Sequence, residues 1–346
     1  MSYTSSWRSP SNIALIKYWG KHGVQLPRNP SLSFTLSISH TDMTLRVVLE
    51  ATNPGLIVLF NGVPKPSFEP KIKSYFDRIQ GHIPWVDHAS IEIDSLNTFP
   101  HAAGIASSAS AMSALALCLE DIDGQIENRP EKKDDQWWSK VSALARLGSG
   151  SACRSVFPVA ALWGKMKDVN GSSDEYAIPW KDDIIPFFHD YQDTILIVNS
   201  DEKRVSSSVG HELMSGLAYA TTRYEVAEKN AHQLINCMRS KPELDQFITI
   251  CESEALQLHA LMMSGDNPFI LMQPNTISII NEIWRFRKES QVPVCFTLDA
   301  GPNVHLLYPA AYKKIVLDWI DNNLKQYCAD GQYILDQVGS GPEKLK

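Results

Sequence analysis

The sequence predicts a globular protein of mixed strands and helices that divides into two domains. Its 346 residues are 44% hydrophobic and 21% charged, a composition typical of a folded chain with room for one large or two medium domains. Short apolar and β-branched runs in the first hundred residues indicate strands, and long apolar periodicities after residue 210 indicate helices. The polar stretch at residues 165–183, with Asn-Gly-Ser-Ser at 170–173, marks the boundary between the two domains.

The overall charge and the cysteine pattern exclude several classes of protein. A net charge of -7 argues against a nucleic-acid binder, so any anionic ligand must meet a local positive cluster. Six scattered cysteines, with no C-x-x-C pair and no secretory leader, indicate reduced thiols in a cytoplasm. No apolar run reaches the roughly 18 residues of a membrane helix. The ten histidines lack the spacing of a protein metal site.

The first candidate ligand site is a cationic stretch near the N-terminus. Residues 13–19 form an apolar, strand-like run, yet Lys17 lies inside the run and Lys21 lies just beyond it. A buried ammonium is costly unless an anion meets it. A strand whose lysines extend to solvent is the alternative, but Tyr18, Trp19 and a glycine between the two lysines favour contact with a ligand.

The residues that follow are predicted to form scaffold. The Asn61-Gly62 pair predicts a type I′ hairpin turn, because both central positions of that turn require positive φ. Residues 70–83 have the pattern of an amphipathic helix, whose basic residues we interpret as a solvated face. The apolar face of this helix is expected at Ile72, Tyr75, Phe76 and Ile79. Strands are expected at residues 32–39, 42–50, 56–60 and 89–96.

A serine-rich loop that leads into a helix is the second candidate. Residues 99–120 pass through Ser107, Ser108 and Ser110 and continue as an Ala/Leu-rich helix, which Ser107 or Ser108 is placed to cap. The free N–H groups of a helix start attract phosphate, so a phosphate cradle is one interpretation. An ordinary capped core helix is the other, and this stretch taken alone favours it. The Lys of a Walker loop is missing, so no P-loop is predicted.

A turn rich in glycine and serine is the third candidate. Residues 121–135 have the composition of an exposed connection, and a helix is expected at 136–147. The Gly-Ser-Gly-Ser sequence at 148–151 lets the backbone approach a ligand, and Arg154 offers a planar fork for a carboxylate or phosphate. A flexible turn is the alternative, although small residues on one side of Arg154 and an apolar run on the other argue against a surface position.

The second half of the chain adds one acidic candidate. The strand expected at 292–298 ends in Asp299, which Ala-Gly-Pro-Asn follows, and a strand at 304–308 is expected to pair with it. Asp299 is either a turn former or a carboxylate aimed into a site, and taken alone the turn is favoured. Cations and hydroxyls occur together at 203–208. The remaining elements are a strand at 194–199 and helices at 211–238, 242–263, 276–288 and 312–324.

Five segments resemble those of a single enzyme family. They are NIALIKYWGK (12–21), LPRNPSLSFTLS (26–37), FPHAAGIASSAS (99–110), ARLGSGSACRS (145–155) and TLDAGPNVH (297–305). Together, and in this order over nearly the whole chain, they resemble diphosphomevalonate decarboxylase. That family belongs to the superfamily of galactokinase, homoserine kinase, mevalonate kinase and phosphomevalonate kinase. KYWGK together with GSGSACRS is specific to the decarboxylases.

The resemblance implies an α+β fold of two lobes with the ligands in the cleft between them. Residues 1–185 would form a lobe like ribosomal protein S5 domain 2, and residues 186–346 a ferredoxin-like lobe. The implied reaction converts (R)-5-diphosphomevalonate and ATP to isopentenyl diphosphate, ADP, phosphate and carbon dioxide, as a step of isoprenoid biosynthesis. The implied partners are this substrate, ATP and a nucleotide-borne Mg²⁺, without nucleic acid or membrane, in a cytoplasmic homodimer.

The resemblance also implies roles for individual residues. Asp299 matches the catalytic aspartate, Arg154 the arginine beside the substrate carboxylate, and Lys17 the lysine near that site. The positions that match substrate contacts are Tyr18, Trp19, Lys21, Ser149, Ser151 and Ser207. The positions that match the ATP phosphate loop and its surroundings are Gly104, Ser107, Ser108, Ser110 and Ser208.

Four departures from the family pattern bear on substrate preference. His101 stands where a small hydroxylated residue is common, Ala111 replaces a frequent Gly, Phe157-Pro158 replaces glycines, and His211 replaces Met. They leave the reaction class unchanged but leave open a monophosphate substrate. The alternatives are a sister enzyme acting on mevalonate 5-phosphate, a 3-kinase that stops before decarboxylation, and a non-catalytic nucleotide sensor.

Overall fold

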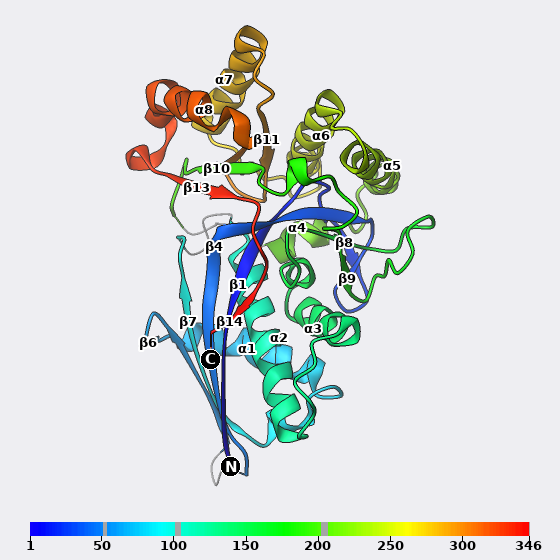
Figure 1. Cartoon of the computed structure of the whole chain (residues 1–346), viewed down its shortest axis with the longest axis vertical. Helices are drawn as coiled ribbons and strands as arrows, with labels where there is room; N and C mark the ends of the chain where they lie inside the picture. Colours follow the sequence, from blue (N-terminus) through cyan, green and yellow to red (C-terminus); the bar gives the residue numbers. More distant parts are fainter. Residues whose placement is uncertain (51–53, 101–104, 202–206, 346) are drawn as a thin grey trace.

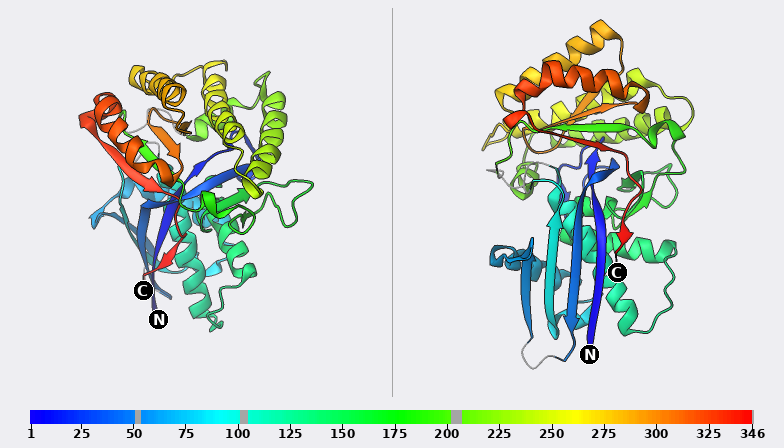
Figure 2. Two further views of the ribbon diagram at one scale, coloured as in Figure 1. Left: turned by 45° about the horizontal axis from the view of Figure 1, so that its top comes forward. Right: turned by 60° about the vertical axis from the view of Figure 1, so that its left-hand side comes forward.

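The computed structural model describes residues 1–50, 54–100, 105–201 and 207–345. It has two lobes, each built around its own sheet (Figures 1 and 2). Both chain termini lie at the lobe with the long strands, the lower one in Figure 1. In the described ranges, no helix combines the length and the apolar content needed to cross a membrane. The two-lobed α+β fold expected from the resemblance is confirmed.

An eight-stranded sheet forms the lower lobe. Its main path runs β14-β1-β4-β7-β5-β6, with β8 beside β4 and β9 beside β8. Among its described strand pairs, only β5–β7 is parallel. The strands are β1 (Ser2–Ala14), β4 (Ser31–Val48), β5 (Gly55–Phe60), β6 (Val63–Pro64), β7 (Ser90–Asn97), β8 (Ala160–Trp163), β9 (Ala177–Pro179) and β14 (Glu343–Lys344). A separate small hairpin joins β2 (Lys21–His22) and β3 (Leu26–Pro27).

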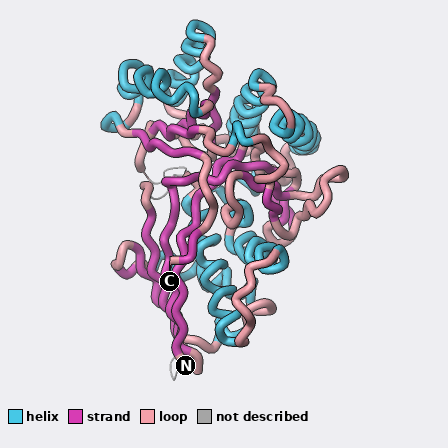
Figure 3. The backbone as a smooth tube through the Cα atoms, viewed as in Figure 1, coloured by secondary structure: helices cyan, strands magenta, loops and turns pink. Residues whose placement is uncertain are grey.

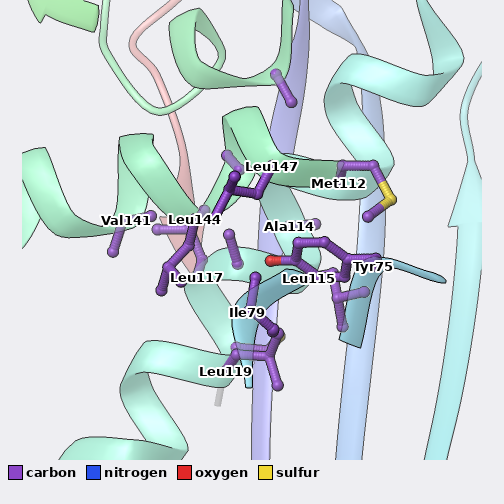
Figure 4. Packing of buried hydrophobic residues seen from close by; sticks show 14 of the residues in the cluster. Tyr75, Ile79, Met112, Ala114, Leu115, Leu117, Leu119, Val141, Leu144 and Leu147 are labelled. Carbon is purple, nitrogen blue, oxygen red and sulfur yellow. The ribbon is translucent and has the colours of Figure 1, made fainter. Parts of the chain in front are cut away.

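Three helices lie on one side of this sheet and complete its core (Figure 3). They are α1 (Glu69–Ile79), α2 (Ser107–Ile126) and α3 (Asp135–Gly148). Leu115 of α2 is fully buried in one cluster with Tyr75 and Ile79 of α1 and Leu144 of α3 (Figure 4). The predicted apolar face of α1 is confirmed, because its four residues are all buried. Most of α2 is buried, so this helix holds the start of the serine-rich segment against a rigid core.

The upper lobe contains an antiparallel four-stranded sheet in the order β11-β12-β10-β13. Helices follow β10 and β12, which produces the β-α-β-β-α-β succession of a ferredoxin-like lobe. The strands are β10 (Gln192–Leu196), β11 (Cys295–Leu298), β12 (Val304–Tyr308) and β13 (Tyr333–Gln337). The helices are α4 (Ser207–Leu213), α5 (Ala220–Arg239), α6 (Leu244–Met263), α7 (Pro274–Ser290) and α8 (Lys313–Trp319).

The end of the chain ties the two lobes together. After β13 the chain returns to the large sheet, where β14 pairs with β1. Buried Asp336 of β13 accepts hydrogen bonds of 2.8 Å from the backbone N–H groups of Ser37, Ile38 and Ser39 in β4. The division predicted at 185/186 falls between β9 and β10 and stays a prediction.

Two sequence-based strand predictions were wrong in extent. The run at 13–19 is not a strand, since β1 ends at Ala14 and Lys17 lies in the irregular segment beyond it. The strands expected at 32–39 and 42–50 are a single strand, β4, because His40 and Thr41 between them pair with Pro10 and Ser9 of β1 without a turn. The type I′ turn at Asn61-Gly62 is confirmed by φ values of 54° and 72°.

The helix predictions also needed correction. Ala106, in the left-handed region, precedes α2 without a side-chain cap bond, so neither Ser107 nor Ser108 caps this helix. The helix runs on to Ile126, through part of the connection expected at 121–135, because its acidic residues form ion pairs with Arg129 and Lys140. The helix expected at 211–238 is two helices, α4 and α5.

Candidate active site

A cavity of about 610 Å³ brings together side chains from both lobes. The lower lobe supplies Lys17 and Arg154, and the upper lobe supplies Asp299. These three residues are far apart in the sequence, and their convergence is the arrangement that the resemblance requires. The other predicted residues that line the cavity are Tyr18, Trp19, Lys21, Ser107, Ser108, Ser149 and Ser151.

Asp299 lies at the cavity because it directly follows a buried strand. Leu298 at the end of β11 and Ala300 are both buried. The backbone carbonyl of Asp299 accepts hydrogen bonds from the Gly301 N–H (2.8 Å) and from Nε2 of His259 on α6 (3.2 Å). These contacts fix the backbone, and the residue is both part of a tight turn and a wall of the site.

Lys17 is a buried ammonium held at the base of the cavity. Only 1% of the residue is exposed, and its Nζ donates a hydrogen bond of 2.6 Å to the Ala14 carbonyl. Burial lowers the pKa of Lys17 from 10.5 to about 8, while Asp299 and Glu254 act in the opposite direction. An anion bound beside this ammonium would replace part of its lost hydration.

Arg154 is oriented by neutral groups that leave its positive charge available. Its Nε and Nη2 donate to Oδ1 of Asn12 at 3.3 and 3.1 Å, and its Nη1 donates to Oγ of Ser31. The guanidinium carbon lies 6.0 Å from the centre of the Trp163 ring. Burial lowers the pKa of Arg154 from its ordinary value, and nearby Asp299 partly offsets this effect. A carboxylate that enters the cavity therefore meets a pre-oriented guanidinium.

The serines line a part of the cavity that suits phosphate. Ser108 at the start of α2 lies 3.3 Å from Ser149, measured between the hydroxyl oxygens, so the helix start and the Gly-Ser-Gly-Ser turn adjoin. A side chain at Gly150 would meet Tyr18 at 2.8 Å and Trp163 at 2.9 Å, so only glycine fits this approach. The N-cap residue of α2, Ala106, makes no side-chain cap bond, so the first N–H groups of the helix are suited to an anion.

Sequence reasoning missed a second cationic wall. Lys71, Ser74 and Arg78, one helical face of α1, line the same cavity as the serines. Arg78 is held there by hydrogen bonds from Nη1 to the Leu147 carbonyl (2.9 Å) and from Nη2 to the Ser74 hydroxyl (3.2 Å). Lys71 and Arg78 are exposed, as the solvated-face interpretation expects, but the face that they form also borders the cavity. Their i, i+3 and i+7 spacing placed them on one face, but nothing in the sequence shows what that face borders.

Aromatic rings form the remaining wall. The ring of His211 from α4 packs between Tyr18 and Trp19, with centroid distances of 4.3 and 4.8 Å. Lys21 lies beyond this group and its Nζ donates to Oε1 of Gln25 at 3.4 Å. All four residues line the same cavity as Asp299 and the α1 residues.

The remaining predicted contacts are not in this cavity or lie outside the described side chains. Ser110 is fully buried in α2, where its hydroxyl bonds to Thr41 (2.7 Å) and to the Ser107 carbonyl (3.2 Å), so we leave it out of the ATP contacts. Gly104 lies outside the described residues. Ser207 and Ser208 begin α4, and their side chains lie outside what the structure describes.

Two family models together match nearly the whole chain. Residues 9–177 match the diphosphomevalonate decarboxylase-like N-terminal domain, and residues 194–344 match the mevalonate 5-diphosphate decarboxylase C-terminal domain. Among curated proteins, diphosphomevalonate decarboxylase from Ganoderma lucidum is 28% identical over 341 residues, covering 92% of this chain and 81% of the relative. The rat enzyme of the same name is also 28% identical, covering 98% of this chain and 82% of its own.

Solved structures have the same architecture. Mevalonate diphosphate decarboxylase from Staphylococcus aureus superposes with a TM-score of 0.85 at 29% identity, covering 100% of this chain and 99% of its own. MDDEF, solved in complex with MVAPP, AMPPCP and magnesium, superposes with a TM-score of 0.83 at 27% identity over 100% of both chains. The matched domains, the shared fold and the convergence of Asp299, Arg154 and Lys17 show that this chain belongs to the diphosphomevalonate decarboxylase family.

Proposed function

We propose that this protein catalyses the ATP-dependent decarboxylation of (R)-5-diphosphomevalonate to isopentenyl diphosphate. The observation that supports it best is the position of Asp299, Arg154 and Lys17 around one cavity whose other walls carry serines and cations. Its relative MDDEF binds MVAPP, an ATP analogue and magnesium. An acidic protein can hold two polyanions here because a local group of lysines and arginines lines this cavity.

The first chemical step activates a poor leaving group. The tertiary 3-hydroxyl must be phosphorylated before it can leave, and Asp299 orients this hydroxyl and accepts its proton as the γ-phosphoryl group of ATP arrives. ADP departs with the electrons of the broken P–O bond. The positive charges of Lys17 and Arg154 interact with the Asp299 carboxylate and stabilise charge on the phosphoryl oxygens.

The second step forms the double bond. The 3-phosphate leaves with the electrons of the C3–O bond, and cationic character develops at C3. The bond between C2 and the carboxyl carbon then breaks, its electrons form the C2–C3 double bond, and carbon dioxide departs. Arg154 positions the carboxylate rather than binding it tightly, since tight binding would favour the charged carboxylate over the departing product.

The triphosphate of ATP fits the walls made by α1, α2 and the Gly-Ser-Gly-Ser turn. Ser107, Ser108 and Ser149 offer hydroxyls, and Lys71 and Arg78 offer positive charge. Within the described part of the chain, no group of three or more His, Cys, Asp or Glu residues is arranged to hold a metal. We therefore propose that Mg²⁺ arrives with the nucleotide, whose charge it neutralises.

A product assay tests the proposed reaction. The protein is incubated with ATP and Mg²⁺ and with mevalonate, its 5-phosphate or its 5-diphosphate, and ADP and carbon dioxide are measured. We expect equal amounts of both products from the 5-diphosphate. ADP without carbon dioxide would identify a 3-kinase, and faster turnover of the 5-phosphate would identify the sister enzyme. The absence of both ADP and carbon dioxide would contradict a catalytic function.

We further propose a cytoplasmic homodimer. Support for the compartment comes from the cysteines, since all six are free and buried, as expected where thiols stay reduced. Support for the dimer comes from the family resemblance. Light scattering of the purified protein at several concentrations tests the dimer, and a monomeric mass throughout would contradict it.

A further inference from the structure

His211 has a fixed tautomer. Its Nδ1 accepts a hydrogen bond of 3.0 Å from the backbone N–H of Gly20, so Nδ1 cannot carry a proton. Burial lowers the pKa of His211 to about 3, an effect that nearby Lys21 strengthens. The imidazole is therefore neutral at any ordinary pH, and its single proton lies on Nε2.

The position of this ring is fixed as tightly as its proton. Tyr18 and Trp19 flank it, with ring centroids 4.3 and 4.8 Å away. At Gly210, the residue before it, a side chain would approach the Trp19 ring to 2.3 Å, so only glycine lets α4 come this close. His211 also lines the cavity, which makes Nε2 the atom that a ligand can reach.

We propose that His211 donates a hydrogen bond from Nε2 to a phosphoryl oxygen of the substrate's diphosphate and thereby helps to select that substrate. This inference rests on the proposed function. The ligand atom is assigned by neighbouring charge: Lys21 and Asp299 act on the ring, whereas the carboxylate end of the substrate belongs at Arg154. The acceptor on the Lys21 side is the diphosphate.

A neutral donor has an advantage over a cation at this position. A protonated imidazole would attract the Asp299 carboxylate and weaken it as a proton acceptor. The neutral Nε2–H group instead positions a phosphoryl oxygen through a directional hydrogen bond and adds no charge next to Asp299. His211 would therefore hold the diphosphate and leave the reacting end unchanged.

Two substitutions separate the donor from the rest of the ring. In His211→Asn, Oδ1 can still accept from the Gly20 N–H, but the donor at the Nε2 position is lost. In His211→Gln, the longer side chain places an amide N–H near the former Nε2. Removing a hydrogen bond to a charged oxygen should weaken substrate binding roughly 10- to 100-fold. We expect this loss for Asn and its partial recovery for Gln.

The measurement is calorimetric titration of each nucleotide-free protein with (R)-5-diphosphomevalonate, so that no turnover is needed. The affinity for ATP, measured in parallel, should change less than about twofold, because His211 is not on the proposed nucleotide walls. Equal affinities of wild type and His211→Asn for the diphosphate would overturn the inference. A wild-type protein that binds this substrate but releases no carbon dioxide would instead overturn the proposed function alone.

Nitrogen-15 spectra of the wild-type histidines test the same contact without any variant that must fold. The His211 signal, expected to show a neutral Nε2–H tautomer, should shift at Nε2 when the diphosphate is added. A signal that stays unchanged at saturation, or one that shows a proton on Nδ1, would contradict the proposed hydrogen bond.

Discussion

The fold lowers the pKa of Lys17 into the pH range in which enzyme activity can be measured. Burial lowers its pKa from 10.5 to about 8. Only the ammonium form can balance charge on a phosphoryl group, so we expect kcat/KM to fall as the pH rises through about 8. A profile of kcat/KM against pH measures this step, and a rate that stays flat well above pH 8 would contradict it.

Lys17→Arg is the matched control, because arginine stays protonated throughout this range and should remove the step in the pH profile even if activity is reduced.

The stability of the protein should change with pH in the opposite direction to its activity. Between about pH 8 and 10.5 the unfolded chain keeps a proton that folded Lys17 has released, so this residue makes the free energy of unfolding rise with pH. A falling rate without a loss of structure therefore separates this titration from alkaline unfolding.

Asp299 is the residue on which the proposed first chemical step depends. Asp299→Asn keeps the shape but removes the proton acceptor and its charge. We expect turnover to fall by at least about 10³-fold, the scale of losing a general base together with its orienting charge. ATP affinity, measured by calorimetry, should be nearly unchanged, and near-normal turnover would remove Asp299 from the mechanism.

At the scale of single residues, the sequence predicts those whose chemistry is unusual for their surroundings. A lysine within an apolar run, an arginine after small residues and an aspartate after a buried strand all lie at the cavity. Lys71 and Arg78 could not be recognised, because charged residues on an amphipathic helix usually face solvent. Ser110 was misjudged for the opposite reason, since one helical turn carries it from the start of α2 into the core.

At the scale of elements, α5 and α6 hold the segment that contains Lys17. The carboxylate of fully buried Glu254 on α6 accepts a hydrogen bond of 2.9 Å from the backbone N–H of Lys17. It also accepts hydrogen bonds from Nη1 and Nη2 of buried Arg223 on α5, at 2.8 and 2.6 Å. The upper lobe thus positions Lys17, a proposed catalytic group that belongs to the lower lobe.

Glu254→Gln should destabilise the protein strongly, because it leaves the Arg223 guanidinium buried without its counter-charge. The expected loss in free energy of unfolding is about 3 kcal/mol or more. Asp183→Asn is the control, since it breaks an exposed ion pair with Arg239 and should cost less than about 1 kcal/mol. Urea denaturation compares the two, and equal losses would show that the Glu254 pair adds nothing beyond an exposed one.

Element boundaries could be predicted only where local rules decide them. The turn at Asn61-Gly62 and the pair β11–β12 are local and were predicted correctly. The length of α2 depends on distant partners. In the sequence alone, the acidic C-terminal end of α2 resembles an exposed connection. In the structure, Arg129 and Lys140 pair with Glu120, and Lys344 pairs with Asp121.

At the scale of the whole molecule, the two lobes were predictable but their connection was not. The long polar stretch before residue 185 indicates that one sheet ends and another begins. Nothing local in the last residues indicates that β13 completes the upper sheet while β14 pairs with β1 in the lower one. Such pairing depends on contacts more than three hundred residues apart, which composition and periodicity do not encode.

Asp336 makes this connection testable. In β4, residues 37–39 lie where the pairing with β1 shifts register, and the Asp336 carboxylate accepts their three N–H groups. Asp336→Ala removes a charged acceptor from all three donors, of which only the Ser39 N–H belongs to a buried residue, and should lower the free energy of unfolding by about 2 kcal/mol or more. Asp318→Ala, an exposed site on α8, is the control and should change it by less than about 0.5 kcal/mol.

Loss of the Asp336 contacts should also loosen one lobe from the other. Because Arg154 and Asp299 come from different lobes, a looser connection makes the assembled cavity less populated and lowers kcat/KM. Each sheet keeps a core of its own, besides the apolar cluster that the two lobes share. We expect the denaturation curve of Asp336→Ala to broaden into two steps, followed by circular dichroism and by tryptophan fluorescence. Coincident single transitions with full activity would show that the lobes are held together without this carboxylate.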